Sequence, residues 1–358
     1  MCFINENFFI FIAVFLFTAV AVFSLVLSGH NSRPCPTDYL SYIDAMVSFS
    51  LIFLAFTFIA SLMRNLSCGY SGLKCSILHL KDNYLRLDRL FGLVFLLLII
   101  PIFLNSYTIL KTNANQIKPF EFDELFMNFD YILHAGNHPW QLLFPYLSER
   151  SSTVFIDRLY AQGWFLSWIT IFIWAAWTTD RRVRWIFFSN FILAWILLGT
   201  FMAHTFPSAG PCYFHMVSSY PSPYLPLMEN LWKISHETDL VAVNGQATLW
   251  RVYLGGLSVQ GEGISAMPSM HISMMTTCTL GAYSLNRIVG YIYMVLTLLF
   301  LIGSIYLGWH YAIDGYVSII LTAFLWFLLS KVANKKFCDQ PSTIPTVLHE
   351  QKRSQAAF

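Results

Sequence analysis

Hydrophobic residues in this chain fall into eight long stretches separated by polar segments. Each stretch is close to the roughly 20 residues that an α-helix needs to cross a bilayer. The eight predicted membrane helices lie at about residues 8–28, 42–63, 90–108, 162–179, 183–205, 267–284, 288–308 and 311–330. This pattern predicts an all-α, polytopic membrane bundle with about eight transmembrane helices.

Two of these stretches have a less regular composition. The sixth is rich in Ser, Thr and Met, which makes it less apolar than its neighbours. The first could be a cleaved signal peptide, but it is long and lacks a basic region before the apolar run. We interpret it as a retained membrane anchor.

Basic residues concentrate in every second polar segment, which predicts the orientation of the bundle. The segments after the second, fourth and sixth stretches and the C-terminal tail include Lys74, Lys81, Arg86, Arg181, Arg182, Arg184, Arg287, Lys331, Lys335 and Lys336. Cytoplasmic loops carry such an excess of Lys and Arg. The longer segments 109–161 and 206–266 are therefore expected on the outer side, which is periplasmic or luminal.

Residues 119–134 within the first long outer segment alternate at helical spacing. The apolar members are Phe122, Leu125, Phe126, Phe129, Ile132 and Leu133, and the acidic members of the other face are Glu121, Asp123, Glu124 and Asp130. This pattern predicts an amphipathic helix that lies on the membrane surface, or alternatively one that packs on the bundle. The Pro- and Gly-containing segment 206–266 is expected to form a vestibule over the helix ends.

Composition agrees with a membrane protein and excludes several other classes. The 358 residues are 56% hydrophobic and 11% charged, whereas soluble domains carry about 25% charged residues. A net charge of +2 gives no sign of nucleic-acid binding. The odd count of seven cysteines argues against a full disulfide framework, although Cys35 and Cys212 both fall on the outer side and could pair there.

Two polar motifs at the expected outer ends of apolar helices suggest chemistry. His310 and Asp314 are four residues apart and share a helix face, so the carboxylate can orient the imidazole and leave one ring nitrogen free. His271 follows Pro268 and Ser269 at a predicted helix start, where exposed N–H groups favour an anion. Together they predict a nucleophile facing an anion site and a second acid or base.

Other interpretations of the same residues stay open. A histidine at a helix end is often only an interfacial polar residue, and a His–Asp pair in a membrane can be a proton relay in a transporter. A metal site would need further ligands, for which His204 and His215 are available on the same side. We expect neither a metal nor a cofactor, since the helix dipole, donors and histidines can supply the electrostatic stabilisation.

The two motifs resemble a known family. Residues 265–271 (SAMPSMH) and 306–315 (YLGWHYAIDG) are similar to the second and third signature motifs of the type-2 phosphatidic acid phosphatase superfamily. More narrowly, they resemble the inositol phosphorylceramide synthase branch, an inositolphosphotransferase-type domain. Residues 130–140 (DYILHAGNHPW) and 208–211 (SAGP) also resemble bacterial members of that branch.

The resemblance implies a role for each motif residue. His310 would be the phosphoryl-accepting nucleophile, Asp314 would orient it, and His271 would be the general acid and base. Ser269 and the Met270 backbone would help to bind phosphate.

Two departures from the family pattern favour a head-group transferase over a phosphatase. The arginine of conventional lipid phosphatases is replaced by Ser304, and their first motif, a lysine followed by Arg-Pro, has no evident counterpart, since Arg33-Pro34 lacks the lysine. Another cation must meet the phosphate, and Arg251, then Lys233, are our candidates, with Ser304 as a further phosphate contact.

We therefore expect a lipid phosphotransferase that acts on a phospholipid or lipid phosphate through a phosphohistidine. The alternatives are a phosphatase of the same superfamily acting on a lipid phosphate or polyprenyl diphosphate, and a proton-coupled transporter or non-catalytic scaffold. The expected units are accessory helices in 1–118, a catalytic core in 119–334 and a cytoplasmic tail in 335–358. The motifs favour a bacterial inner membrane, with the active site on the outer face.

Overall fold

The computed structural model describes the chain except residues 1, 29–39, 66–68, 118–119, 256–262 and 338–358. All regular secondary structure in the described part is helical, which confirms the predicted all-α class. Seven described helices are long and apolar enough to cross a membrane. They are α1 (Cys2–Ser28), α2 (Leu40–Arg64), α4 (Leu87–Ile117), α8 (Trp164–Trp177) with the helical residues before it, α9 (Arg181–Ile196) with those after it, α15 (Arg287–Tyr306) and α16 (Ala312–Lys336).

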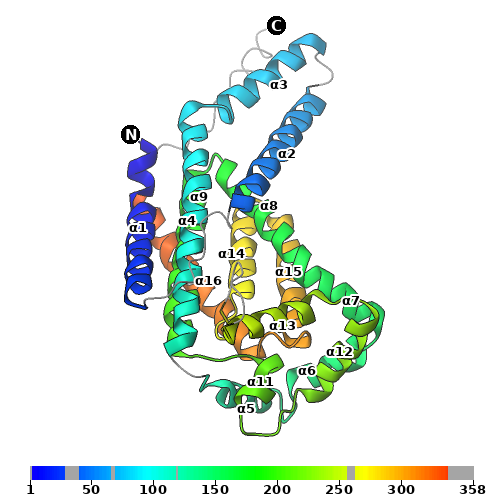
Figure 1. Ribbon diagram of the computed structural model, residues 1–358. Helices are drawn as coiled ribbons and strands as arrows, with labels where there is room; N and C mark the ends of the chain where they lie inside the picture. Colours follow the sequence, from blue (N-terminus) through cyan, green and yellow to red (C-terminus); the bar gives the residue numbers. More distant parts are fainter. Residues whose placement is uncertain (1, 29–39, 66–68, 118–119, 256–262, 338–358) are drawn as a thin grey trace.

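The eighth predicted membrane helix is α14 (Met270–Leu285), which is shorter than the others. It packs against α8, α9, α15 and α16 near the centre of the bundle (Figure 1). Its hydroxyl side chains form hydrogen bonds to neighbouring helices, which explains why this stretch is less apolar. These bonds join Ser273 to Thr322 (2.8 Å), Asn190 to Thr277 (2.8 Å) and Thr279 to Thr297 (2.8 Å).

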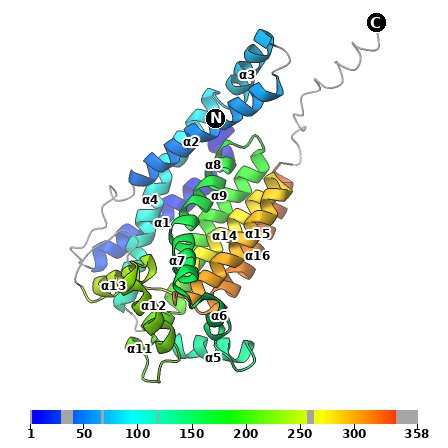
Figure 2. The same cartoon turned by 90° about the vertical axis from the view of Figure 1, so that its right-hand side faces the viewer.

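The N-terminal helices are arranged differently on the two sides of the bundle. α1 packs against α4 and α9, and α2 packs against α4, α8 and α3 (Gly69–Asn83). α2 slants away from the axes of the central helices and carries α3 at the far end (Figure 2). Many of the large apolar side chains of α1 and α2 are exposed, as expected of helices that face lipid.

Two membrane helices contain a π-helical turn. η3 (Leu159–Gly163) joins α7 (Arg150–Arg158) to α8, and η4 (Leu197–Met202) joins α9 to α10 (Ala203–Thr205). A π turn inserts one residue into a helix and is frequent at functional sites. Both turns lie toward the end of the bundle at which α16 begins, which we call the His310 end.

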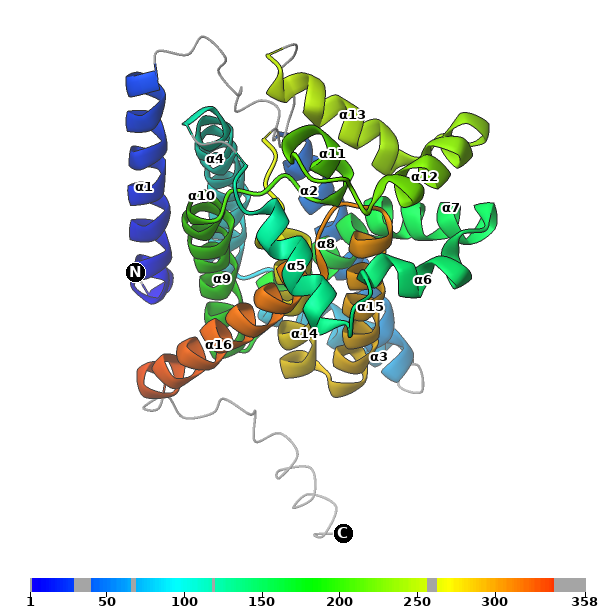
Figure 3. The same ribbon diagram turned by 90° about the horizontal axis from the view of Figure 1, so that it is seen from below.

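Short helices cover the His310 end, opposite α3 (Figures 1 and 3). These are α5 (Asp123–Leu133), α6 (Pro139–Leu147), α7, η5 (Pro211–Tyr213), α11 (Phe214–Val217), α12 (Leu225–Glu237) and α13 (Val241–Tyr253). α13 begins on α7, because the Asp157 carboxylate accepts hydrogen bonds from the Val241 (2.9 Å) and Ala242 (2.8 Å) N–H groups. The short helices therefore form one connected cover.

α5 confirms the helix predicted within residues 119–134, and it packs on the bundle near α16. Its polarity is the reverse of the simple expectation, since Asp123 and Asp130 are buried. The apolar side chains of Leu125, Phe129 and Ile132 are exposed. The acidic residues face inward because they bind backbone N–H groups there, as described below.

The hydrogen bond between Ser273 and Thr322 is expected to stabilise the contact between α14 and α16. Changing both residues, as Ser273→Ala with Thr322→Val, should lower the free energy of unfolding in detergent by about 1 kcal/mol. The thermal unfolding midpoint measures this change. Thr170→Val is the matched control, because its exposed hydroxyl binds only the Leu166 carbonyl of its own helix. Equal midpoints for the double variant and this control would contradict the assignment.

Candidate active site

A cavity of about 380 Å³ lies at the His310 end and brings both predicted histidines together. Its size is within the usual range for ligand pockets. Much of the wall is aromatic, and the rings of Tyr107, Trp195 and Trp309 line it with His271 and His310. The ring centroids of the two histidines are 6.3 Å apart. The cavity therefore has room for a small group between two imidazoles.

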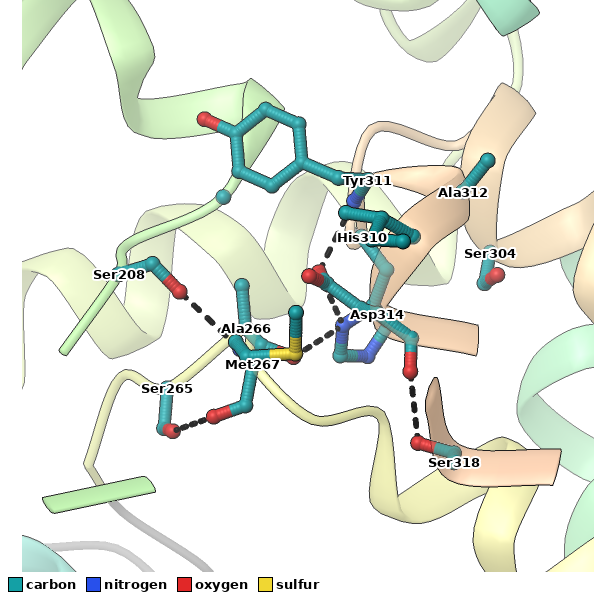
Figure 4. A network of polar contacts seen from close by, with 12 residues as sticks. Ser208, Ser265, Ala266, Met267, Ser304, His310, Tyr311, Ala312, Asp314 and Ser318 are labelled. Carbon is teal, nitrogen blue, oxygen red and sulfur yellow. Dashed lines mark hydrogen bonds and ion pairs between the residues drawn. The ribbon is translucent and has the colours of Figure 1, made fainter. Parts of the chain in front are cut away.

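His310 is buried and its ring orientation is fixed from one side (Figure 4). Its Nδ1 atom lies 2.8 Å from the Ala266 carbonyl oxygen and 3.4 Å from Oδ2 of Asp314. An Nδ1–H group therefore donates mainly to Ala266, with the buried Asp314 carboxylate beside it. This arrangement leaves Nε2 unprotonated and available as a nucleophile.

Ala266 was not predicted to take part, and it is held by Ser208. The Ser208 carbonyl accepts a hydrogen bond from the Ala266 N–H (2.9 Å), and its hydroxyl oxygen accepts one from the Met267 N–H (3.0 Å). Figure 4 shows Ser208 on the side of this strand away from His310. The SAGP segment thus supports the carbonyl that orients the nucleophile, a role that spacing alone does not indicate.

His271 stands in the first turn of α14 between two aromatic rings. Its ring centroid is 4.9 Å from that of Tyr160, at an interplanar angle of 25°, and 4.6 Å from that of Trp164. The Trp164 indole N–H also donates to the His271 carbonyl (3.2 Å). The first N–H groups of α14 have no partner within the helix, so this end offers donors and a favourable dipole to an anion.

Lys111 on α4 supplies the positive charge that the sequence left unassigned. Among the described residues that line the cavity, it is the single lysine or arginine. Gly263, at φ +99°, packs on it so closely that a Cβ there would lie 2.9 Å from Cγ of Lys111. One signal could have found it, because Lys111 is followed by Lys118-Pro119, a Lys version of the family's first motif.

Two buried carboxylates of α5 hold the turn that carries His310. Asp130 accepts hydrogen bonds from the N–H groups of Ala312 (2.7 Å) and Ile313 (2.9 Å) at the start of α16. Asp123 accepts one from the Tyr311 hydroxyl (2.8 Å) and two from the Ala209 and Gly210 N–H groups (2.8 Å each). Burial raises the pKa of each carboxyl to about 6, and these hydrogen bonds oppose the rise.

The other predicted site residues are divided between the cavity and its surroundings. Met270 lines the cavity, whereas Ser269 is buried beside it, with an N–H that donates to the Asp314 carbonyl (3.3 Å). Arg251 and Lys233 are exposed and do not line the cavity. Ser304 also lies outside it, where its carbonyl accepts from the N–H groups of Trp309 (3.0 Å) and His310 (3.2 Å).

Two further predictions concern residues around the site. Cys212 is buried and Cys35 lies outside the described residues, so their pairing stays a prediction. His204 and His215 do not line the cavity. Within the described part of the chain, no three His, Cys, Asp or Glu side chains form a group that could hold a metal ion.

Asp130 is expected to contribute strongly to stability, because it binds two backbone N–H groups that are otherwise buried. Asp130→Ala leaves both donors unsatisfied and should lower the free energy of unfolding by about 3 kcal/mol. Thermal unfolding followed by tryptophan fluorescence in detergent measures this loss. Glu121→Ala, an exposed acid just before the same helix, should change the midpoint little. A midpoint for Asp130→Ala as high as that of the control would contradict this role.

Comparison with known proteins gives one family. A family model described as the PAP2 superfamily matches residues 126–328, which is more than half of the chain. The matched range contains His271, His310 and Asp314 but ends short of Lys111 on α4. Neither the curated proteins nor the solved structures give a significant match.

Proposed function

Because the chain belongs to the PAP2 superfamily, we propose that it is a lipid phosphotransferase that moves a phospho-head-group between two lipids. Membership gives phosphatase- or phosphotransferase-type lipid chemistry, and the helices make the chain a multi-pass membrane protein. One observation carries the proposal beyond this level. His310 has Nδ1 bound to the Ala266 carbonyl and lines a cavity opposite His271.

The reaction takes place in two steps. Nε2 of His310 attacks phosphorus, a P–N bond forms, and the P–O bond to the donor's lipid alcohol breaks. His271 gives a proton to that leaving oxygen. The acceptor hydroxyl then returns a proton to His271 and attacks phosphorus, so that a P–O bond forms and the P–N bond breaks. The Asp314 carboxylate stabilises the positive charge on His310 during both steps.

Charge matching favours a phosphodiester donor. A phosphate monoester carries a charge of roughly −1.5 to −2 at neutral pH, whereas a diester carries only one negative charge. The described wall of the cavity presents one permanent cation, Lys111, together with the N–H groups of α14. This balance suits a diester head group, such as phosphoinositol, and supports transfer over hydrolysis of a lipid phosphate.

The proposed catalytic unit is larger than residues 119–334. α4 contributes Tyr107 and Lys111 to the cavity wall, so we include this helix in it. The basic segments of the sequence support an active site on the outer face of a bacterial inner membrane. Roles for Ser269 and the Met270 backbone in phosphate binding are also part of the proposal, through the start of α14.

The covalent intermediate provides the decisive experiment. Purified protein in detergent is incubated with phosphatidylinositol radiolabelled at phosphorus, with and without ceramide. His271→Ala should trap acid-labile, alkali-stable label on histidine, and His310→Ala should carry none. His79→Ala is the matched control, because this exposed histidine of α3 is far from the cavity. Activity that survives His310→Ala would eliminate the mechanism.

The products of the same experiment separate the two kinds of acceptor. A labelled lipid that forms only in the presence of ceramide identifies a transferase. Release of labelled inositol phosphate at the same rate without ceramide would instead identify a hydrolase, with water as the acceptor. No reaction with any phospholipid would favour a transporter or a scaffold.

Lys111 is expected to bind the phosphate in the transition state. Lys111→Met keeps the aliphatic stem but removes the charge, and should lower kcat/KM with phosphatidylinositol by about a hundredfold or more. Gly263→Ala should lower it by about tenfold, because the new methyl group displaces the lysine stem. Gly255→Ala is the control, since Gly255 has a similar φ of +86° but no neighbour within 4 Å. Equal activities for the two glycine variants would contradict this placement of Lys111.

A further inference from the structure

The Tyr160 side chain has an unused hydrogen-bonding group inside the cavity wall. The residue is only 5% exposed, and its hydroxyl has no hydrogen-bond partner among the described residues. Tyr160 lines the same cavity as both histidines. A buried hydroxyl without a partner costs about 1–3 kcal/mol, and such groups are rare in proteins. The hydroxyl therefore needs a partner that the chain itself does not supply.

Local structure explains how Tyr160 comes to lie there. It belongs to the π turn η3, which precedes the helix that carries Trp164. Gly303 on α15 permits the approach, because a Cβ at that position would lie 3.3 Å from Cδ2 of Tyr160. The ring is packed between His271 and Phe300, with centroids 4.9 and 6.4 Å away. Packing on both sides leaves the Tyr160 ring little freedom to turn.

The stacking geometry limits what the hydroxyl can reach. The Tyr160 ring is within 25° of parallel to the His271 ring, so it lies over a face of the imidazole. The proton that His271 exchanges lies in the imidazole plane, pointing toward the reacting oxygen. Tyr160 is therefore beside this line and not on it. The natural partner of its hydroxyl is a group next to the reacting oxygen on the same alcohol.

We propose that the Tyr160 hydroxyl binds a second hydroxyl of the acceptor alcohol, adjacent to the one that attacks phosphorus, so that the enzyme selects a lipid diol over a lipid alcohol with one hydroxyl. The inference rests on the proposed transferase function. It identifies Tyr160 as a specificity-determining residue and assigns the wall formed by Tyr160 and Trp164 to the acceptor.

A role for Tyr160 in binding phosphate is less well supported. The phosphate already has Lys111 and the N–H groups of α14 as partners, and it must lie between His271 and His310 to be transferred. The Tyr160 ring instead stacks over His271 beside Trp164, where the surroundings are mainly aromatic. An isolated hydroxyl in such surroundings favours partners that bring a matching hydroxyl.

Competition between two acceptors of equal chain length tests the proposal. Dodecanol and vicinal dodecanediol are offered together with labelled phosphatidylinositol, and the two labelled products are separated. The wild-type protein should prefer the diol by about fivefold to tenfold in kcat/KM, as expected for one neutral hydrogen bond. Tyr160→Phe should reduce this preference to about twofold or less, while the rate with dodecanol stays within a factor of two.

Tyr293→Phe is the matched control, because its buried hydroxyl binds the Ser167 carbonyl away from the cavity. It should keep the diol preference. A Tyr160→Phe variant that keeps the wild-type preference would overturn the proposal, and so would an equal loss of rate with both acceptors, which indicates a phosphate contact or a purely structural role. If the wild-type protein labels neither alcohol, the transferase function itself fails, and the two failures are distinguishable.

Discussion

The carboxylates of Asp123 and Asp130 connect a short surface helix to the backbone turn on which His310 stands. Asp130 binds the first N–H groups of α16, and Asp123 binds the Tyr311 hydroxyl next to His310. Hydrogen bonds to a charged group contribute about 1.5–3 kcal/mol each, and here they also offset the cost of burying two acids. If this connection were lost, the turn would be free to move and the nucleophile would lose its fixed position.

The same principle operates in three places around the cavity. Asp157 binds the start of α13, the Ser208 main chain and hydroxyl bind the segment at Ala266, and Ser304 binds the backbone at His310. Most of these contacts join a side chain of one segment to the main chain of another. The two imidazoles are thus held at a fixed separation by backbone geometry, as preorganised electrostatic catalysis requires. The cover of short helices is part of the active site and not a separate domain.

The sequence predicts the helical bundle and the pair of histidines because both depend on local patterns. Apolar stretches define membrane helices, and the His–Asp spacing places two groups on one face. Asp130 was assigned to the polar face of a surface helix, because its partners on α16 are 182 and 183 residues away in the chain. Ala266 acts through its carbonyl, which every residue has. Lys111 resembles an ordinary basic residue at a helix end, and only the fold brings α4 to the cavity.

The two π turns have a consequence for how helix length can vary in this fold. Each contains one more residue than an α-helical turn would, and η3 joins a segment that carries Asp157 and Tyr160 to one that carries Trp164. Removing one residue there would make the helix regular and rotate the two segments by about 100° relative to each other. The carboxylate under α13 and the ring beside His271 would then face away from the cavity. The reading frame of the helix, and not only its composition, is therefore a determinant of the site.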